Sequence, residues 1–495
     1  MSYEVIVVGA GPVGLTLAIE LHLAGIRPVV LERLAEPAPQ RKSRGVGPLA
    51  FEALQRRGLG PALEACQPER QDEKKRDHGS AKNHFAWIHK IDPDLQEEPD
   101  RTGRLIWQPD LERILADHVG ALGISVLREY TVVDLTQNAE NVSITVDTPD
   151  GEQRLEAAYV VGCDGGHSTI RTLAGFDFPG TAPIMTARQA QVQIADPDKL
   201  PPSGRLEGGM LIHGPGVLGA FDFMEGPDVP RGPVTPEELQ ASVRRVAGVD
   251  VTITEVSDAL RFTDNARQAG TYRLGRIFLA GDAAHVHSPN GGQGLNLGLS
   301  DAVNLGWKLA AQVRGVAPDG LLDTYTEERH PVGASVLDNT RAQSALMRPG
   351  PHTDALRDIV SELMDIREVN QYFSRLLGGL SIRYAFPYVK PDDHQLIGTY
   401  CPDLTFVTAK GAGQSRLSEF TTTARAVLLI PAGREAADGW RDRLEIVEVD
   451  CIDDDRLSAV LVRPDGVIAW ACTPGETPDE DQLQTALTTW LGIPT

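Results

Sequence analysis

The chain has 495 residues, too many for one hydrophobic core, so two to four domains are expected. Its formal net charge of −22 argues against binding to nucleic acid or to an anionic membrane surface, because both need a locally basic face. The five cysteines show no C-x-x-C spacing, which argues against a disulfide framework or a metal site and favours a reducing cytoplasm.

The first predicted elements are a strand, a turn and a helix. Glu20 and three glycines interrupt the apolar opening from Val5 to Leu23, and no cleavage site follows, so neither a signal peptide nor a membrane span is expected. A strand over residues 4–8 leads through glycines into a helix over 15–24, and a second strand starts at Pro28 and ends at Glu32. This order predicts parallel strands joined by a right-handed crossover.

The glycine turn reads GAGPVG and places Gly9, Gly11 and Gly14 in a G-x-G-x-x-G frame. Gly9 permits the turn, Gly11 lets the backbone approach a pyrophosphate, and Gly14 allows the helix to pack closely. Glu32 follows at about the 20-residue interval at which a carboxylate accepts hydrogen bonds from ribose hydroxyls. A lone glycine triplet is often only a turn, but the strand, the helix and Glu32 in register predict dinucleotide binding.

The segments that follow predict further domains. Residues 67–104 are polar and irregular, with a charge run at 73–76, and no cofactor chemistry is legible there. A helix over 110–122 and strands over 125–146 could extend the first sheet. Short strands, Gly/Pro turns and one helix over 236–247 make residues 179–267 a separate sheet domain and the candidate substrate domain.

The last third begins with a strand over 276–280, a glycine-rich loop and an amphipathic helix over 301–313. Helices follow from 321 to about 377. Strands over 426–430, 444–449 and 459–462 and a helix over 479–491 then predict an independent α/β tail.

Two segments carry a family resemblance. YVVGCDGGHSTIR, at 159–171, and GRIFLAGDAAHVHSPNGGQGLNLGLSDAVNLGWKLA, at 275–310, resemble the Asp-Gly and Gly-Asp motifs of class A FAD-dependent aromatic hydroxylases with the para-hydroxybenzoate hydroxylase fold. The resemblance extends through YTEERHPVGASVL, at 325–337, to LVRPDGVIAW, at 461–470, and is strongest to the hydroxylases that tailor aromatic polyketides.

This resemblance implies an α/β fold of three parts. A Rossmann-like FAD-binding domain would comprise residues 1–178, with the excursion at 67–104, and residues 268–385. A β-sheet substrate domain would be inserted at 179–267, and a thioredoxin-like C-terminal domain without its redox C-x-x-C would occupy 390–495.

Roles can be assigned to residues of the Gly-Asp motif. Asp282 lies where a strand meets a glycine loop, so its carboxylate can accept hydrogen bonds from the ribityl hydroxyls; the alternative is a helix-capping aspartate. Backbone N–H groups from Pro289 to Asn296 can face the pyrimidine edge of the flavin, where negative charge gathers on reduction. His285 and His287 are interpreted as ordinary packed, hydrogen-bonded residues.

Further roles follow from the resemblance alone. It implies that Asp164 contacts the flavin side while Ser168 and Arg171 hold its loop, although Arg171 could equally form a structural ion pair. It places Arg44 against the flavin and Gln108 near the ribityl chain. The full set implied to bind FAD is Gly9, Gly11, Gly14, Glu32, Arg33 beside the adenine ribose, Arg44, Gln108, Val132 through its backbone at the adenine, Asp164, Asp282, Pro289, Gly292, Gly294, Leu295 and Asn296.

The implied activity is monooxygenation of an aromatic substrate through a flavin hydroperoxide, with O₂ as co-substrate and NADPH or NADH bound transiently as reductant. Three alternatives stay open: hydroxylation of a polycyclic polyketide, hydroxylation of a small phenol, and a flavin-dependent reductase without oxygen transfer. Asn290 is expected on the substrate side of its loop. No catalytic acid or base and no metal ligand is assigned, no nucleic-acid or membrane partner is expected, and a homodimer is compatible with the sequence.

Overall fold

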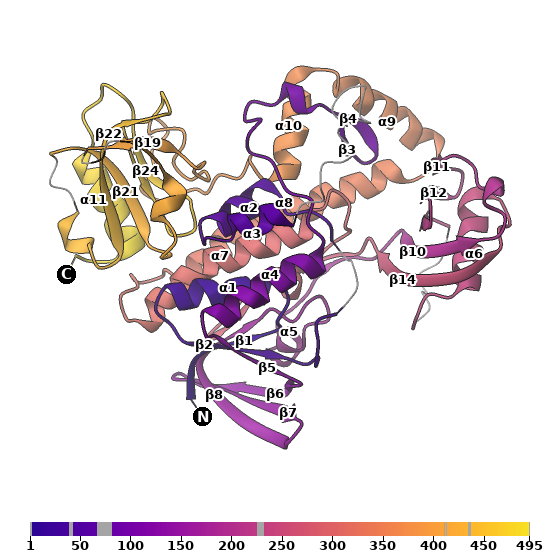
Figure 1. Cartoon of the computed structure of the whole chain (residues 1–495), viewed down its shortest axis with the longest axis horizontal. Coiled ribbons are helices and arrows are strands. Elements are labelled where there is room, and N and C mark those ends of the chain that lie inside the picture. The colour runs from indigo at the N-terminus through magenta and orange to yellow at the C-terminus, as the bar shows by residue number, and fades with distance from the viewer. Residues whose placement is uncertain are drawn as a thin grey trace.

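A parallel sheet forms the base of the N-terminal half (Figure 1). The computed structural model describes residues 2–38, 43–66, 82–224, 232–409, 411, 413–433 and 437–494. Strand β1 carries Val5, Ile6 and Val7, each 0% exposed, as expected for a strand covered on both faces. The strand order is β16-β17-β8-β1-β2-β5, in which β17, β8, β1, β2 and β5 pair in parallel, and β6 and β7 extend the sheet from β8 as an antiparallel meander.

The bounds of these strands are β1 Ser2–Val8, β2 Pro28–Glu32, β5 Ser125–Arg128, β6 Thr131–Gln137, β7 Val142–Thr148, β8 Gly151–Gly162, β16 Arg273–Leu274 and β17 Ile277–Leu279. The associated helices are α1 Pro12–Leu23, α2 Pro48–Gln55, α3 Gly60–Ala65, α4 Gln108–Ala121, α5 Thr169–Leu173 and α7 Gly294–Val313. Helix α7 begins seven residues before the predicted start at 301. It approaches α1 closely because Gly306, facing Glu20, has no side chain.

An antiparallel sheet forms the second body, at the right of Figure 1. Its strand order is β11-β12-β13-β10-β14, and helix α6 packs Leu239, Val243 and Val246 into the same apolar cluster as the sheet. The bounds are β10 Thr186–Ile194, β11 Gly204–Leu206, β12 Gly209–Gly214, β13 Val217–Asp222, α6 Pro236–Ala247 and β14 Ile253–Thr263. A small sheet of β9 Gly180–Thr181, β15 Ala266–Gln268 and β18 His285–Val286 lies where the chain returns to the first body.

Three helices and a hairpin form a third group, in which α8 (Asp323–Met347) is followed by α9 (Pro351–Leu363) and α10 (Arg367–Gly378). The hairpin pairs β3 (Asn83–Phe85) with β4 (Ile88–Ile91). The sequence prediction of an irregular excursion over 67–104 is therefore wrong for this hairpin. Phe85, Ile88 and Ile91 are buried in one apolar cluster with residues of α8 and α9, and this packing orders a segment whose sequence is mostly polar. Residues 67–81, with the charge run, lie outside the described residues.

The C-terminal body is a mixed sheet packed with helix α11 (Glu480–Leu491). Its order is β20-β19-β22-β21-β23-β24, in which β21 and β22 pair in parallel and the other neighbours are antiparallel. The bounds are β19 Thr405–Thr408, β20 Gln414–Arg416, β21 Ala426–Pro431, β22 Leu444–Ile452, β23 Ala459–Val462 and β24 Ile468–Cys472. The thioredoxin-like architecture and the domain boundaries stay predictions. Among the described residues, no helix combines the length and apolarity that crossing a bilayer requires.

Buried charges join the C-terminal body to α7 and α8. Arg463 donates to both carboxylate oxygens of Glu328, at 2.6 and 2.8 Å, and Lys308 Nζ lies 2.9 Å from Glu328 Oε2. Burial alone would raise the pKa of Glu328, but the charges of Arg463 and Lys308 outweigh burial and lower it. The seam between the bodies therefore contains an ionised carboxylate at neutral pH.

Glu328→Gln should lower the free energy of unfolding at pH 7 by about 3 kcal/mol, because it leaves buried cations short of a counter-charge while Asp465 still pairs with Arg463. Because the pKa of Glu328 in the folded chain is below its ordinary value of 4.5, its contribution is complete above pH 4.5 and is lost as pH falls further. Urea unfolding of both proteins across this range measures the effect. The exposed Glu97→Gln is the control and should change stability by less than about 1 kcal/mol; a Glu328→Gln protein as stable as the wild type at pH 7 contradicts the assignment.

Candidate functional site

Of the three motif glycines in the turn, one, Gly11, has free space where a Cβ would stand. Gly9 has φ of +108°, and a Cβ there would overlap the carbonyl oxygen of Cys163; a Cβ on Gly14 would overlap the carbonyl oxygen of Gly9. Gly11 has no atom within 4 Å of its Cβ position. Helix α1 then begins at Pro12 with no side-chain cap. The turn thus presents an open face and uncapped N–H groups, which together suit a pyrophosphate.

Residues predicted for the adenosine side lie at the end of β2. Glu32 Oε2 accepts the Ala10 N–H at 2.8 Å, and Oε1 accepts the Leu34 N–H at 2.9 Å, so the carboxylate is fixed beside the glycine turn. Arg33 is exposed on the bend that follows. The Tyr130 N–H donates to the carbonyl oxygen of Glu32 at 2.9 Å, which brings the segment leading to Val132 alongside.

Asp164 meets the same turn through its backbone. A Cβ on Gly9 would lie 3.1 Å from the Asp164 Cα. The Asp164 carboxylate is directed at α5, where it accepts the N–H groups of Thr169 and Ile170 at 2.7 and 3.1 Å and the Ser168 hydroxyl. Its side chain therefore caps α5, and only its main chain faces the predicted pyrophosphate position.

Arg171 connects the Asp-Gly and Gly-Asp segments. Its guanidinium donates to the carbonyl oxygens of Ala283 at 3.0 Å and Gly166 at 2.8 Å, and it lies 3.8 Å from the centre of the Phe178 ring. Of the two roles left open by the sequence, this geometry favours holding the loop, since the bonds go to main-chain carbonyls.

Asp282 lies in the 3-10 turn η4 (Gly281–Ala283) and is exposed. Its carboxylate makes no hydrogen bond or ion pair with any described residue, so it does not act as a helix cap. Gly281, with φ of +62°, packs its Cα against Val13 of α1. This contact places Asp282 close to the start of α1. The carboxylate oxygens of Asp282 are free to accept hydrogen bonds from hydroxyl groups.

The start of α7 faces the same region. The Gly292 N–H closes a turn onto the carbonyl oxygen of Pro289 at 2.9 Å, and Gly292, with φ of +64°, has nothing within 4 Å of its Cβ position. Helix α7 begins at Gly294 without a side-chain cap, and Leu295 and Asn296 in its first turn are half-buried. An uncapped N-terminus beside open space favours negative charge.

Asn296 links this helix to the segment that carries Arg44. Its Oδ1 accepts the Gly47 N–H at 2.6 Å, and its Nδ2 donates to Gly292 O at 2.9 Å. The Gln108 N–H donates to Ser43 O at 2.8 Å, so Arg44 and Gln108 lie on adjoining segments. The Gln108 side chain itself donates to Glu112 at 2.7 Å, along α4.

Asn290 differs from its predicted orientation. It is 8% exposed, and its Nδ2 donates to Ser344 Oγ of α8 at 3.3 Å. The amide is therefore directed into the protein, where a hydroxyl satisfies it, instead of toward a substrate.

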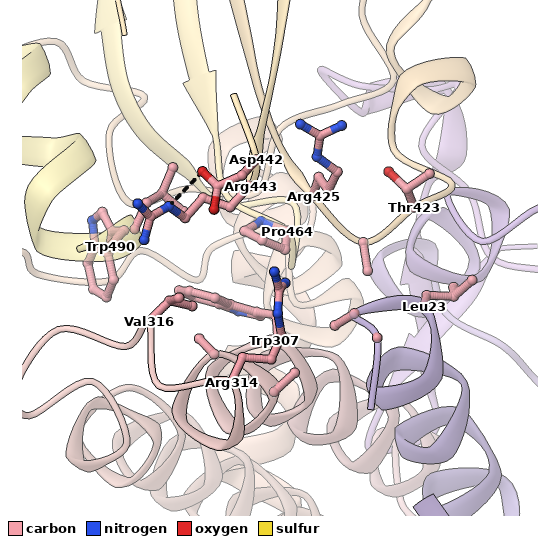
Figure 2. Close-up of a pocket in the computed structure, with 16 residues that line it drawn as sticks. Leu23, Trp307, Arg314, Val316, Thr423, Arg425, Asp442, Arg443, Pro464 and Trp490 are labelled. Carbon is pink, nitrogen blue, oxygen red and sulfur yellow. Dashed lines mark ion pairs between the residues drawn. The ribbon is translucent and has the colours of Figure 1, made fainter. Parts of the chain in front are cut away.

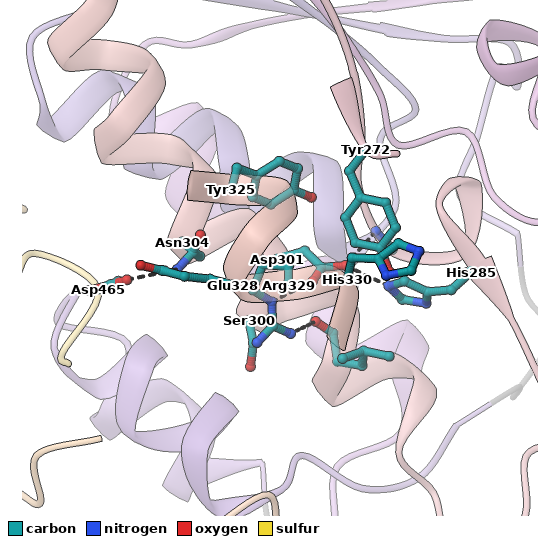
Figure 3. A network of polar contacts seen from close by, with 12 residues as sticks. Tyr272, His285, Ser300, Asp301, Asn304, Tyr325, Glu328, Arg329, His330 and Asp465 are labelled. Atoms are coloured by element: carbon teal, nitrogen blue, oxygen red, sulfur yellow. Dashed lines mark hydrogen bonds and ion pairs between the residues drawn. The ribbon is translucent and has the colours of Figure 1, made fainter. Parts of the chain in front are cut away.

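A buried carboxylate that the sequence analysis missed holds these parts together (Figure 3). Asp301 is 0% exposed; its Oδ2 accepts the Gly281 N–H at 3.1 Å and lies 2.7 Å from His285 Nε2, and its Oδ1 lies 2.7 Å from Arg329 Nε. Burial would raise the pKa of Asp301, but the charge of Arg329 and the hydrogen bond with His285 lower it. Arg329 also donates to Leu297 O in the first turn of α7 at 3.1 Å. The available signal was a charged residue on the apolar face of α7.

His285 accordingly has a structural partner, in line with its interpretation as a packed residue. The structure also contains a cavity of about 380 Å³ at the seam of α1, α7 and the C-terminal body, where Leu23, Arg314 and Trp490 lie (Figure 2). Leu23 ends α1, and the glycine turn lies at the opposite end of that helix, so this cavity is separate from the residues assembled above.

Two protein-family models match this chain. Residues 2–340 match the FAD binding domain family, and residues 394–494 match the family described as aromatic-ring hydroxylase, C-terminal. The chain is 41% identical to a 12-dehydrotetracycline 5-monooxygenase/anhydrotetracycline 6-monooxygenase of Streptomyces rimosus, covering 100% of both chains. It is 37% identical to a dialkyldecalin synthase of Streptomyces rugosporus, covering 99% of both. The solved structure of the anhydrotetracycline hydroxylase OxyS from Streptomyces rimosus matches with a TM-score of 0.89 and 39% identity, covering 100% of both chains.

Two glycine variants separate a binding role from a folding role. Gly11→Ala should fold like the wild type, because its Cβ enters open space, yet weaken FAD binding about tenfold or more by obstructing the pyrophosphate. Gly14→Ala should lose stability first, because its Cβ overlaps the Gly9 carbonyl. FAD titration of the deflavinated proteins, with thermal unfolding of each, measures both effects. Wild-type FAD affinity in Gly11→Ala would exclude the open face as the binding site.

Asp282→Ala should release flavin without unfolding the chain, because the carboxylate is exposed and makes no hydrogen bond to the rest of the described protein. Flavin absorbance per mole of purified protein and the thermal midpoint are the two readouts. The control is Asp258→Ala, which removes a carboxylate from strand β14 of the antiparallel sheet, away from the site. Asp258 has a positive φ. Full flavin occupancy in Asp282→Ala would refute the ribityl role.

Proposed function

The chain belongs to the FAD-dependent aromatic-ring hydroxylases, and from that premise we propose that it hydroxylates a polycyclic aromatic substrate of the polyketide type. It is an FAD-dependent monooxygenase that uses NADPH or NADH and O₂. The observation that carries the flavin chemistry of this proposal is the approach of two uncapped helix N-termini, those of α1 and α7, to a region that also holds the free carboxylate of Asp282.

These residues fit an FAD molecule in both shape and charge. The open face at Gly11 and the first turn of α1 would hold the pyrophosphate, with Glu32 at the ribose. Asp282 would accept hydrogen bonds from ribityl hydroxyls, and the N–H groups of Gly294, Leu295 and Asn296 would face the pyrimidine edge of the flavin. Bound FAD supplies electron transfer from the nicotinamide and activation of oxygen.

The protein's own contribution is to bind, orient and exclude water. The N-terminus of α7 would stabilise negative charge on the flavin ring. Arg329 holds this end of the helix in place by donating a hydrogen bond to Leu297 O. Arg171 fixes the loop that follows Asp164 relative to Ala283. Because both supports are arginine side chains that donate to main-chain carbonyls within the protein, the site is organised in advance for the cofactor.

The substrate class rests on similarity over the whole chain. The relative named for anhydrotetracycline is 41% identical with complete coverage, which supports a multi-ring phenolic substrate over a small phenol. The five cysteines are all free thiols, which supports a cytoplasmic location. A homodimer stays a proposal that light scattering on the purified protein tests.

One comparison favours a second candidate function. The relative named dialkyldecalin synthase is 37% identical over 99% of both chains, and its name describes no oxygen transfer. The same scaffold thus supports ring closure as a second candidate function.

The test is turnover with anhydrotetracycline and with a simple phenol in the presence of NADPH and ¹⁸O₂. Monooxygenation predicts substrate-stimulated NADPH consumption and a product heavier by one ¹⁸O atom. Faster reaction with the multi-ring phenol supports the polyketide class, whereas preference for the simple phenol contradicts it. A product of unchanged mass, formed without NADPH, would replace monooxygenation with the second candidate.

A further inference from the structure

The β3–β4 hairpin has a strained two-residue turn. Ala86 and Trp87 have φ of +49° and +64°, in the left-handed region where such hairpin turns usually place Gly or Asn. A tryptophan in this region is unusual and energetically unfavourable, so the surrounding structure must support it. Backbone strain of this kind is enriched at ligand sites.

Two helices and the Gly-Asp loop fix the turn. The Ala86 N–H donates to Gln343 Oε1 of α8 at 3.2 Å, and the Ala86 carbonyl accepts from Arg357 of α9 at 2.6 Å. Gln343 Nε2 would lie 2.9 Å from a Cβ on Gly291. Gln343 therefore lies between the hairpin turn and the loop that leads to the start of α7.

Two rings on this hairpin have free surfaces. His84 stacks on Trp87 with ring centres 4.8 Å apart and an angle of 17°, and both residues are half-buried. His84 Nδ1 accepts the Trp87 N–H at 3.3 Å, which leaves the proton on Nε2. Nε2 makes no hydrogen bond to any described residue. The pair thus presents an aromatic surface together with two N–H donors, His84 Nε2–H and the indole N–H of Trp87.

A row of rings joins the hairpin to the second sheet. The Trp87 ring meets Phe221 of β13 edge-on at 6.5 Å, and Phe221 meets Phe262 of β14 at 6.0 Å. Phe221 is 7% exposed, so it supports Trp87 from the protein side and adds no contact surface of its own. The stacking area is therefore the Trp87 indole, whose two fused rings suit a fused ring system better than one phenol ring.

His84 is a neutral donor at working pH. Burial and the charges of His89, Arg44 and Arg357 lower its pKa to about 4. A neutral imidazole with a fixed tautomer donates a hydrogen bond without releasing its proton.

We propose that Trp87 stacks against the fused rings of the substrate and that the Nε2–H of His84 donates a hydrogen bond to a ring oxygen, so that the hairpin selects polycyclic phenols. The inference rests on the proposed function and adds its specificity residues. A hydrogen bond to a phenolate oxygen would fix which ring carbon faces the flavin, and edge-on contact with Phe221 would hold Trp87 in the stacking position.

Trp87→Asn is the decisive variant, because Asn suits a left-handed turn better than Trp does. The thermal midpoint and flavin content should be equal to or above those of the wild type, while the Kd for anhydrotetracycline, read from the flavin spectrum, should rise about tenfold. The Kd for a simple phenol should change less than twofold. Tyr372→Leu, which removes an exposed ring on α10, is the matched control and should leave both constants unchanged.

The donor is tested by two substitutions of His84. His84→Phe keeps a ring for stacking but removes the N–H and should raise the Kd for anhydrotetracycline about fivefold to tenfold, in line with one hydrogen bond. His84→Gln restores an N–H donor and should recover most of the affinity. Rescue by Gln distinguishes a donor from a residue that only packs.

Unchanged anhydrotetracycline affinity in Trp87→Asn and His84→Phe overturns the proposal, as does a wild-type protein that binds neither this ligand nor a hydroxyanthraquinone. Failure of the proposed function looks different: the wild type would bind the polycyclic ligands, and the variants would lose them, without NADPH consumption or ¹⁸O incorporation. The binding measurements decide the inference in either case.

Discussion

The buried carboxylate of Asp301 is the interaction on which the rest of the site depends. One oxygen holds the Gly281 N–H and His285, and the other holds Arg329. Gly281 begins the turn that carries Asp282, and Arg329 reaches the first turn of α7 through Leu297 O. A single ionised group therefore sets the spacing between the free carboxylate and the helix N-terminus. Because all three partners are buried or donate from the main chain, that spacing is fixed before any cofactor binds.

The same network extends to the C-terminal body. Arg329 donates to the Tyr384 hydroxyl at 2.8 Å, and Tyr384 lies 2.9 Å from the Tyr400 hydroxyl. Glu328, the preceding residue of α8, accepts a hydrogen bond from Arg463. Two adjacent residues of α8 thus both connect to the C-terminal body, and one of them, Arg329, also connects to the flavin loop. This arrangement gives the C-terminal body a structural reason to be present although it contributes no residue to the predicted FAD set.

The sequence predicted the steric form of the glycine turn, because glycine spacing follows directly from steric limits, while FAD binding at this turn stays a prediction. Gly9 and Gly14 have no room for a Cβ, and Gly11 faces open space, which matches the roles that the motif implies. The hairpin at 83–91 could not be predicted, since its order comes from packing against α8, α9 and α10 and not from local pattern. The orientation of Asn290 and the role of Asp301 were missed for a related reason: each depends on a partner at a distance in the chain, Ser344 in one case and Arg329 in the other.

A crystal structure of the FAD complex tests the central claim most directly. The account predicts the pyrophosphate over Gly11 at the start of α1, the ribityl chain beside Asp282, and the pyrimidine edge of the ring against the N-terminus of α7. Isoalloxazine density away from the N-terminus of α7, or a pyrophosphate that does not contact the turn at Gly9–Gly14, would contradict it.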